Sequence, residues 1–490
     1  SSDLVRSEIG GASAGPLLSA RGVFGWFFVV SMLAAFAAIW CAPRASLKML
    51  FSVVINGLYR FRVRGIDLVP AAGPAVLVAN HLSWLDGFLL PLACPRHVRM
   101  VVYGPNIRGK FLRMLADQWK FILFDPRPKS IGKALKDIQA GLADGDVIGI
   151  FCEGGISRTG QILGFKRGLE WILDRVEAPI VPVHIDGMWG SVLSFSEGRY
   201  FTKRPRGIRR PLTVRFGSPL PVGSHPDEAR LALQELTAES VRQRMLTRCP
   251  SAAGRASPVG WAAHMATAEA FDGACLVRRE DRLLASLAPG DPLHDSLGLH
   301  AATLLGISAE AVAPTFAVDS ILAAILEKRA TIWLARVDQV AAAAQGGTVL
   351  PGLDRCLEVV VMPLASAAGL PAAIHAAESF REAYGIEPVT AFAPPEAGGL
   401  VAMNSPPNRA TAAHEVTLNR GSVGRVINGV VVWPTVAERT RTGRPRHGSF
   451  PSGDAGRSLA IGATFPGAVG TALAAVLLAD AFDVDGDGFL

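Results

Sequence analysis

The sequence predicts an α/β protein built from two successive α/β domains. At roughly 100–200 residues per domain, a chain of 490 residues is long enough for two or three of them. Short apolar runs alternate with helical stretches across the first half, and a less regular alternation continues from about residue 259 to the end. Such alternation implies an α/β sheet. The apolar runs of the first half lie at 74–80, 121–125, 146–152, 178–185 and 212–216.

Composition excludes several classes of protein. Half of the residues are apolar and 19% are charged, which fits neither intrinsic disorder nor a small secreted scaffold. The six cysteines form no CxxC pair and show no Cys/His ligand spacing, so the sequence predicts neither a structural metal site nor a disulfide framework.

Charge is unevenly distributed along the chain. Residues 44–248 hold 30 basic and 17 acidic side chains, a balance of +13, whereas the remainder holds 19 and 25, a balance of −6. A basic block of this kind favours an anionic partner. An acidic membrane surface, an acidic carrier protein or a nucleic acid would each satisfy it.

The N-terminal segment, residues 1–44, contains a stretch without charged residues from Val23 to Pro43. A helix over about 23–42 is long enough to cross the hydrocarbon core of a bilayer, so we expect a transmembrane helix there; a buried core helix is the alternative. Residues 45–60 read as an interfacial helix. The basic residues that follow the apolar stretch favour a cytoplasmic position for the next domain, and they are Arg44, Lys48, Arg60, Arg62 and Arg64.

The segment 80–86 (NHLSWLD) carries the most informative residues of the chain. His81 and Asp86 stand five positions apart, directly after a predicted buried strand. A carboxylate beside an imidazole fixes its tautomer and leaves the second ring nitrogen to take a proton from an alcohol, as in a general-base pair. Spacing alone also allows a surface histidine and aspartate at the start of a helix.

A second segment, 151–160 (FCEGGISRTG), is a glycine-rich turn after the predicted strand at 146–152. Lys166 and Arg167 follow it, and backbone amides together with such cations suit a phosphate. The run 180–183 (IVPV) then supplies an apolar strand that contains Pro182, as expected near an acyl-chain site.

These three motifs, in this order, resemble the glycerolipid acyltransferase family, the 1-acylglycerol-3-phosphate acyltransferases and their relatives. The resemblance covers residues 45–248, which we take as the first domain. It implies that His81 is the general base and Asp86 its orienting partner. The chain departs from the family at Cys152, where a proline is usual, and at Ile156, where an arginine is usual. The substrate-binding residues that the resemblance implies are Glu153, Gly154, Ser157, Arg158, Lys166, Arg167 and Pro182.

The resemblance also implies partners and a location. The acceptor is a lysophospholipid, and the donor is a thioester of acyl carrier protein or coenzyme A, so acyl transfer needs no cofactor. Membrane lipids are expected partners and nucleic acid is not. We therefore expect a protein of the inner (cytoplasmic) membrane whose catalytic domain faces the cytoplasm.

The second half, residues 249–490, resembles adenylate-forming acyl-acid ligases through the segment 419–426 (NRGSVGRV). That resemblance places Glu396 as the magnesium-linked glutamate and Asp480 as the ribose-binding aspartate. The segment 251–260, in the position of the phosphate loop, lacks most of the expected hydroxyls and has Val259 in place of lysine. We therefore expect a degenerate or truncated AMP-binding domain, which uses ATP and Mg²⁺ only if it is active.

The order of the two domains resembles the bifunctional 2-acylglycerophosphoethanolamine acyltransferase/acyl-carrier-protein synthetases. Two alternatives remain open from the sequence: an ATP-dependent acyl-acid ligase whose active part is the second half, and a catalytically inactive lipid-binding protein. The last residues, 483–490, match only the first part of a calcium-binding loop, so tight calcium binding is not expected. That unfinished motif and the initial Ser1 suggest a piece of a longer protein.

Overall fold

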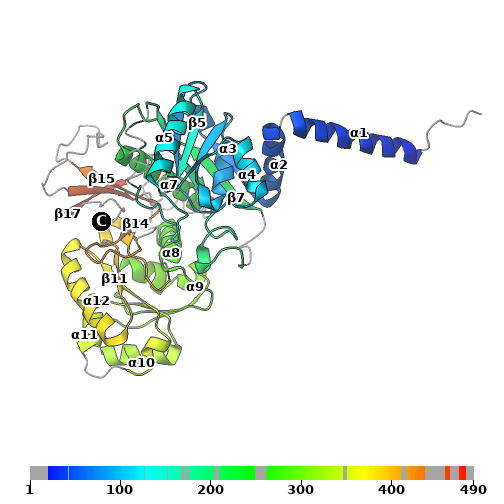
Figure 1. Ribbon diagram of the computed structural model, residues 1–490. Helices are drawn as coiled ribbons and strands as arrows, with labels where there is room; N and C mark the ends of the chain where they lie inside the picture. Colours follow the sequence, from blue (N-terminus) through cyan, green and yellow to red (C-terminus); the bar gives the residue numbers. More distant parts are fainter. Residues whose placement is uncertain are drawn as a thin grey trace, which may run out of the picture.

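The computed structural model describes residues 20–41, 43–125, 127–151, 153–166, 172, 175, 177–203, 209–248, 261–345, 350–409, 417–435, 458–463 and 474–481. These residues form two α/β domains and a small antiparallel sheet, with a long helix at the N-terminal end (Figure 1). The predicted α/β class is confirmed, and both large sheets are mixed rather than wholly parallel.

The N-terminal end forms two helices, α1 (Ala20–Cys41) and α2 (Pro43–Leu58). Helix α1 projects away from the rest of the molecule, whereas α2 lies against the first domain (Figure 1). Where its side chains are described, α1 exposes large apolar groups such as Phe24 and Phe27. Within the described part of the chain, no helix meets the combined length and apolarity that crossing a membrane requires. The transmembrane helix therefore stays a prediction.

The first domain is organised around a sheet for which seven strands are described, in the order β1-β7-β6-β2-β5-β3-β4. Strands β2 to β6 run parallel to one another, while β7 pairs antiparallel with β6 and carries β1 at the edge. The strands are β1 (Tyr59–Arg64), β2 (Ala75–Ala79), β3 (Val98–Tyr103), β4 (Ile122–Phe124), β5 (Val147–Phe151), β6 (Ile180–Asp186) and β7 (Arg210–Phe216).

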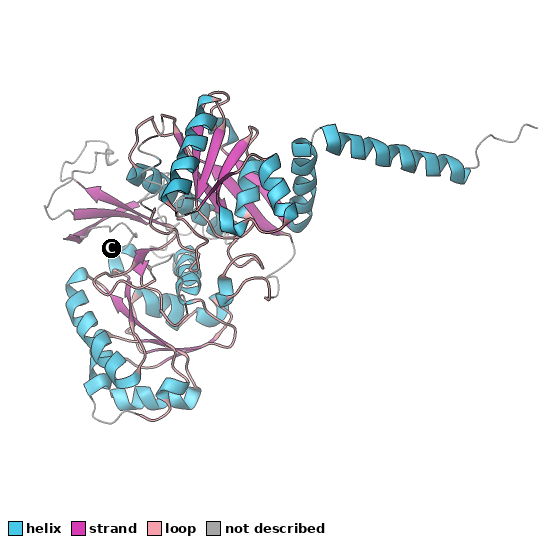
Figure 2. Cartoon of the chain, in the orientation of Figure 1, coloured by secondary structure: helices cyan, strands magenta, loops and turns pink. Residues whose placement is uncertain are grey.

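Helices cover both faces of this sheet (Figure 2). Every side chain of the central strand β2 is buried, and alternate residues point to opposite faces. Leu77 packs in one cluster with Leu89, and Val76 packs in another with Ile138 and Leu233. The burial on both faces explains why this strand reads as a continuous apolar run. The helices of the domain are α3 (Asp86–Ala93), α4 (Lys110–Gln118), α5 (Pro128–Ala143) and α7 (Pro226–Arg248).

The structure corrects the predicted helix over 45–60. Helix α2 ends at Leu58, and residues 59–64 (YRFRVR) form the edge strand β1 beside β7. Their strict alternation of arginine with apolar or aromatic residues is the two-residue period of a strand. The arginines Arg60, Arg62 and Arg64 are exposed, and charge on an edge strand opposes pairing with another chain.

The second domain contains a sheet for which seven strands are again described, in the order β14-β13-β12-β11-β10-β8-β9. Strands β8 to β12 are parallel, and β13 and β14 extend the sheet in antiparallel pairing. The strands are β8 (Arg282–Ala285), β9 (Ser308–Ala311), β10 (Ile332–Leu334), β11 (Val359–Leu364), β12 (Val389–Phe392), β13 (Ala402–Met403) and β14 (Arg425–Val426). The helices are α8 (Trp261–Cys275), α9 (Ala301–Leu304), α10 (Val318–Lys328), α11 (Val337–Gln345) and α12 (Leu370–Tyr384).

A three-stranded antiparallel sheet follows, formed by β15 (Val430–Thr435), β16 (Ser458–Ala463) and β17 (Ala474–Ala481). The predicted phosphate-loop segment 251–260 and the calcium-like segment 483–490 lie outside the described residues. The side chains of Glu396 and Asp480 also lie outside them.

The two domains are joined by an ion network between helices α7 and α8. Arg244 of α7 binds Asp186 at the end of β6 and donates a hydrogen bond of 2.7 Å to Glu269 of α8. The Arg244 side chain is only 18% exposed, so water screens this contact weakly.

We expect Arg244→Ala to lower the free energy of unfolding by about 2–3 kcal/mol, because two partly buried carboxylates lose the largely buried cation that they share. Arg242→Ala, on the same helix, removes only a partly exposed ion pair with Glu239. This variant should change the free energy of unfolding by less than about 1 kcal/mol. Urea titration followed by circular dichroism measures both. Equal destabilisation by the two variants would contradict the assignment of Arg244 to a buried network.

A second expectation concerns pH. His184 of β6 is buried, with Nδ1 3.0 Å from Ser240 Oγ, and burial lowers the pKa of its imidazole to about 4, with Asp186 opposing the shift and Arg244 and Arg215 adding to it. Because the unfolded chain binds this proton more tightly, His184 makes stability fall as the pH drops from about 6.5 toward 4, by up to about 3 kcal/mol. Between pH 4 and 6.5, His184→Gln should flatten the pH dependence of the urea midpoint relative to the parent. An unchanged slope would show that His184 titrates normally.

Candidate active site

A histidine and an aspartate meet at the carboxyl edge of the first sheet, where strand β2 ends. His81 Nδ1 lies 3.0 Å from Asp86 Oδ2, and the Asp86 side chain is completely buried while that of His81 is 18% exposed. When Nδ1 carries the hydrogen and donates it to Asp86, Nε2 presents its lone pair to a substrate. The predicted pair is therefore within hydrogen-bonding distance, and a general base is what it can supply.

The Asp86 carboxylate is held by more than the histidine. Its Oδ2 accepts hydrogen bonds from the backbone N–H groups of Leu82 and Ser83 at 2.6 and 2.7 Å, and its Oδ1 accepts one of 2.5 Å from the Ser83 hydroxyl. Asp86 also begins helix α3, where the helix dipole favours a negative charge. This carboxylate is therefore fixed in place and its charge is stabilised.

The ring and the backbone of His81 are held by the glycine-rich segment. Its ring stacks on Phe151 with centroids 4.1 Å apart. Its backbone N–H donates to Glu153 Oε1 at 3.1 Å, and its carbonyl accepts from the Ser157 N–H at 2.8 Å. Strands β2 and β5 are adjacent and parallel, with Ala79 opposite Phe151, so their two following loops meet at one edge.

The glycine-rich loop has a shape that glycine permits. Gly154 has a φ of +68°, and a Cβ there would lie 2.8 Å from Lys166 Cγ. The Lys166 side chain therefore crosses the loop where a larger residue would exclude it. Ser157 is fully buried and donates from Oγ to the Gln161 carbonyl at 2.9 Å, so it shapes the loop. Arg158 lies with its guanidinium 4.3 Å from the centre of the Phe195 ring.

Two predicted binding residues remain, Pro182 and Arg167. Pro182 is buried within β6, opposite Val78, and its ring lies next to Gly217. Arg167 lies outside the described residues, as does Cys152, where the chain departs from the family. The contact of Pro182 and Arg167 with substrate stays a prediction.

Two basic residues near the site are held by the protein itself. Lys203 is buried, and its Nζ donates to the carbonyls of Ser194 and Ser196 at 2.5 and 2.8 Å. Arg210 donates to the Trp189 carbonyl at 2.7 Å. The Lys203 ammonium therefore fixes a loop that pairs with Ser83 through a bridge at Ser194.

Sequence reasoning missed three contributors to the site. Asn80 ties β2 to β6 by accepting from the Ile185 N–H at 2.7 Å and donating to its carbonyl at 3.1 Å. Ser83 holds Asp86, and Phe151 supports the imidazole ring. Asn80 and Ser83 belong to the quoted motif, so the signal was present. The role of Phe151 depends on pairing between distant strands and had no local signal.

The family model Acyltransferase matches residues 60–186, which contain His81, Asp86 and Glu153. The human 1-acyl-sn-glycerol-3-phosphate acyltransferase alpha is 29% identical over 240 residues, which is 46% of this chain and 77% of that protein. The resemblance inferred from the three motifs is confirmed, and residues 60–186 form an acyltransferase domain.

Two solved structures are also similar. The 1-acyl-sn-glycerophosphate acyltransferase PlsC from Thermotoga maritima has 18% identity and a TM-score of 0.30, over 36% of this chain and 68% of that one. The O-succinylbenzoate coenzyme A synthetase from Bacillus subtilis has 16% identity and a TM-score of 0.32, over 43% of this chain and 39% of that one.

We expect Asp86→Asn to lower kcat/KM for acyl transfer by roughly 10²-fold or more, because the imidazolium formed in the reaction loses its buried counter-charge. Asn keeps the size and most hydrogen bonds of the side chain, so the fold should persist. Asp227→Asn is the matched control, since Asp227 lies 3.2 Å from His225 in an exposed pair far from the motif in sequence. Similar rates for Asp86→Asn and the parent would show that the pair is not catalytic.

Proposed function

We infer that this protein transfers a fatty acyl group from an acyl thioester to a free hydroxyl of a lysophospholipid, in phospholipid synthesis or remodelling. The observation that carries this inference is the His81–Asp86 pair, buried on one side and open on the other, inside the segment that matches the acyltransferase family. The name of the human relative, which acts on 1-acyl-sn-glycerol-3-phosphate, supports an acylated glycerol phosphate as the acceptor class.

We propose that the reaction is a direct acyl transfer from donor to acceptor. His81 Nε2 takes the proton of the acceptor hydroxyl while its oxygen attacks the thioester carbonyl. The new C–O ester bond forms as the C–S bond breaks, and the leaving thiolate takes the proton from the imidazolium. Asp86 stabilises that imidazolium through Nδ1, so no covalent enzyme intermediate is required.

We propose that the glycine-rich loop binds the acceptor phosphate. Lys166 crosses this loop over Gly154, and Arg158 belongs to the loop, so the segment that contacts His81 has two cations. Such cations and backbone amides suit an anionic oxygen cluster. Glu153 holds the His81 backbone at 3.1 Å, and we propose that Ser157, Arg167 and Pro182 shape the same site.

The surroundings suit a lipid substrate. A cavity of ≈ 270 Å³ lies between helices α2 and α3, with Phe51, Phe88 and Trp119 in its wall. Helix α3 begins at Asp86, so this cavity adjoins the helix whose first residue is the proposed partner of His81. We propose that it accepts part of an acyl chain.

We propose that the protein is attached to the inner membrane with its catalytic domain toward the cytoplasm. Helix α1 exposes Phe24, Trp26 and Phe27, and helix α2 exposes Met49 and Val53. Contiguous apolar surface of this kind is buried in a bilayer or against a partner. The basic edge strand β1 would face acidic head groups.

We further propose that residues 249–490 are a vestigial ligase-like domain and that the acyl donor, carried by acyl carrier protein or coenzyme A, reaches the site already activated. Glu396 and Asp480 then mark a former nucleotide site. In this case, transfer proceeds without ATP or Mg²⁺.

The test is acyl transfer from a radiolabelled acyl thioester to lysophosphatidic acid and to lysophosphatidylethanolamine, with the protein in phospholipid vesicles. We expect product without ATP, and a loss of roughly 10²-fold or more in His81→Ala because the general base is removed. His225→Ala, which removes an exposed histidine, is the matched control and should keep the parental rate.

Three outcomes would contradict the proposal. Transfer that persists in His81→Ala excludes this histidine as the base. Product that forms only with ATP, together with pyrophosphate release, favours the ligase alternative. Binding to vesicles with no transfer from either thioester to either acceptor favours an inactive lipid-binding protein.

A further inference from the structure

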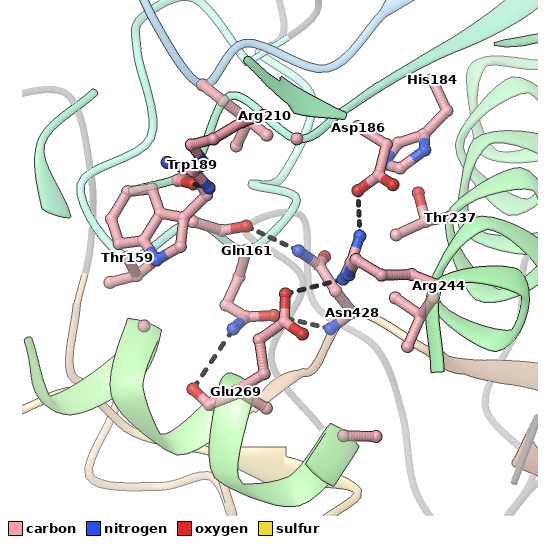
Figure 3. A pocket seen from close by; sticks show the side chains of 17 residues that line it. Thr159, Gln161, His184, Asp186, Trp189, Arg210, Thr237, Arg244, Glu269 and Asn428 are labelled. Carbon is pink, nitrogen blue, oxygen red and sulfur yellow. Dashed lines mark hydrogen bonds and ion pairs between the residues drawn. The ribbon is translucent and has the colours of Figure 1, made fainter. Parts of the chain in front are cut away.

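We propose that the second domain acts as a brace for the acyltransferase site and that Asn428 is the positioning residue through which it acts. This inference rests on the proposed function and goes beyond it, because it assigns a role in acyl transfer to a domain whose own resemblance is to a different enzyme class. The contacts that carry it lie between the glycine-rich loop and the turn that precedes strand β15 (Figure 3).

Asn428 contacts the glycine-rich loop through both ends of its side-chain amide. Its Nδ2 donates to the Gly160 carbonyl at 2.6 Å, and its Oδ1 accepts from the Ile162 N–H at 3.1 Å. The Asn428 backbone N–H in turn donates to Gln161 Oε1 at 2.6 Å. Three consecutive residues, the last of the glycine-rich loop and the two that follow it, are thus bound by a single residue more than 260 positions away in the sequence.

The same loop is connected to the catalytic histidine by short steps. The Gln161 carbonyl accepts from Ser157 Oγ at 2.9 Å, and the Ser157 N–H donates to the His81 carbonyl at 2.8 Å. Moving the Gly160–Ile162 segment therefore moves Ser157, and with it the backbone of His81. Asn428 acts through these residues and has no direct contact with the reacting atoms.

Helix α8 of the second domain also contacts this loop. A Cβ at Gly273 would lie 2.3 Å from the Thr159 carbonyl oxygen, so the helix backbone approaches the loop as closely as glycine allows. Gln161 Nε2 also donates to the Ala270 carbonyl at 3.4 Å. A cavity of ≈ 70 Å³ remains between the domains, with the Arg244 network in its wall (Figure 3).

These contacts predict a selective kinetic effect. The loop held by Asn428 is the one that we assign to the acceptor phosphate, so loosening it should weaken acceptor binding and disturb the alignment of His81. The donor thioester is not assigned to this loop. A general loss of folded protein, by contrast, would lower the apparent kcat and leave the KM values of both substrates unchanged.

The experiment compares Asn428→Ala with the parent and with Asn408→Ala, in the full chain and in vesicles. Asn408 is a matched control, because its Nδ2 donates to the Glu358 carbonyl within the second domain and it does not contact the loop. We expect Asn428→Ala to lower kcat/KM for the lysophospholipid by about 10-fold to 100-fold, with an unchanged KM for the thioester. Asn408→Ala should keep the parental values.

Hydrogen exchange gives a second readout that does not depend on activity. In Asn428→Ala, the amides of residues 153–163 should exchange faster, while those of β10 to β12 keep parental protection. Gly273→Ala, which pushes α8 from the Thr159 carbonyl, should have the same effect on the loop.

The outcomes separate the two proposals. A parent that transfers acyl groups, with Asn428→Ala equal to it in rate and loop exchange, overturns the brace. Faster exchange throughout the second domain also overturns it, since Asn428 would then be a general stabilising residue. A parent without acyl transfer overturns the proposed function, while selective loss of loop protection would still support the brace as a structural contact.

Discussion

The buried Asp86 carboxylate is the constraint on which the active site depends. A fully buried negative charge is tolerated only when its oxygens are well supplied with donors, and here two backbone N–H groups, a serine hydroxyl and an imidazole supply them. Because the backbone donors come from the turn between β2 and α3, the carboxylate also determines how that turn folds. The charge that orients His81 is therefore the same charge that shapes the loop carrying it.

Sheet topology explains why the distant motifs meet. Parallel strands bring their carboxyl ends to one edge, so the loop after β2 and the loop after β5 face each other although their motifs are separated by 72 positions in sequence. The His81 backbone is then held from two sides, by the Glu153 carboxylate and the Ser157 amide. A histidine held in this manner loses little freedom when a substrate binds beside it, which is the physical meaning of a preorganised site.

The second domain contacts the first domain beside this site. Its ion network with α7 is largely shielded from water, and its turn at Asn428 binds the same loop that contacts His81. A domain can keep a surface that supports the reaction of its neighbour, because packing and hydrogen bonding make fewer demands on sequence than catalysis does. The proposed support of the acyltransferase site gives a physical reason for retaining the second domain, in which Val259 stands where the resemblance to ligases implies a lysine.

The sequence by itself predicted the α/β class and the His81–Asp86 pair, because short apolar runs and the order of three motifs can be read along the chain. It also pointed to Glu153 as a site residue, but not to its bond with the His81 backbone. Only the tertiary structure decided that Phe151 supports the imidazole, that Lys203 is buried on loop carbonyls, and that Asn428 reaches the glycine-rich loop. These contacts join residues far apart in the chain, and their energies depend on burial and strand pairing, which no local pattern encodes.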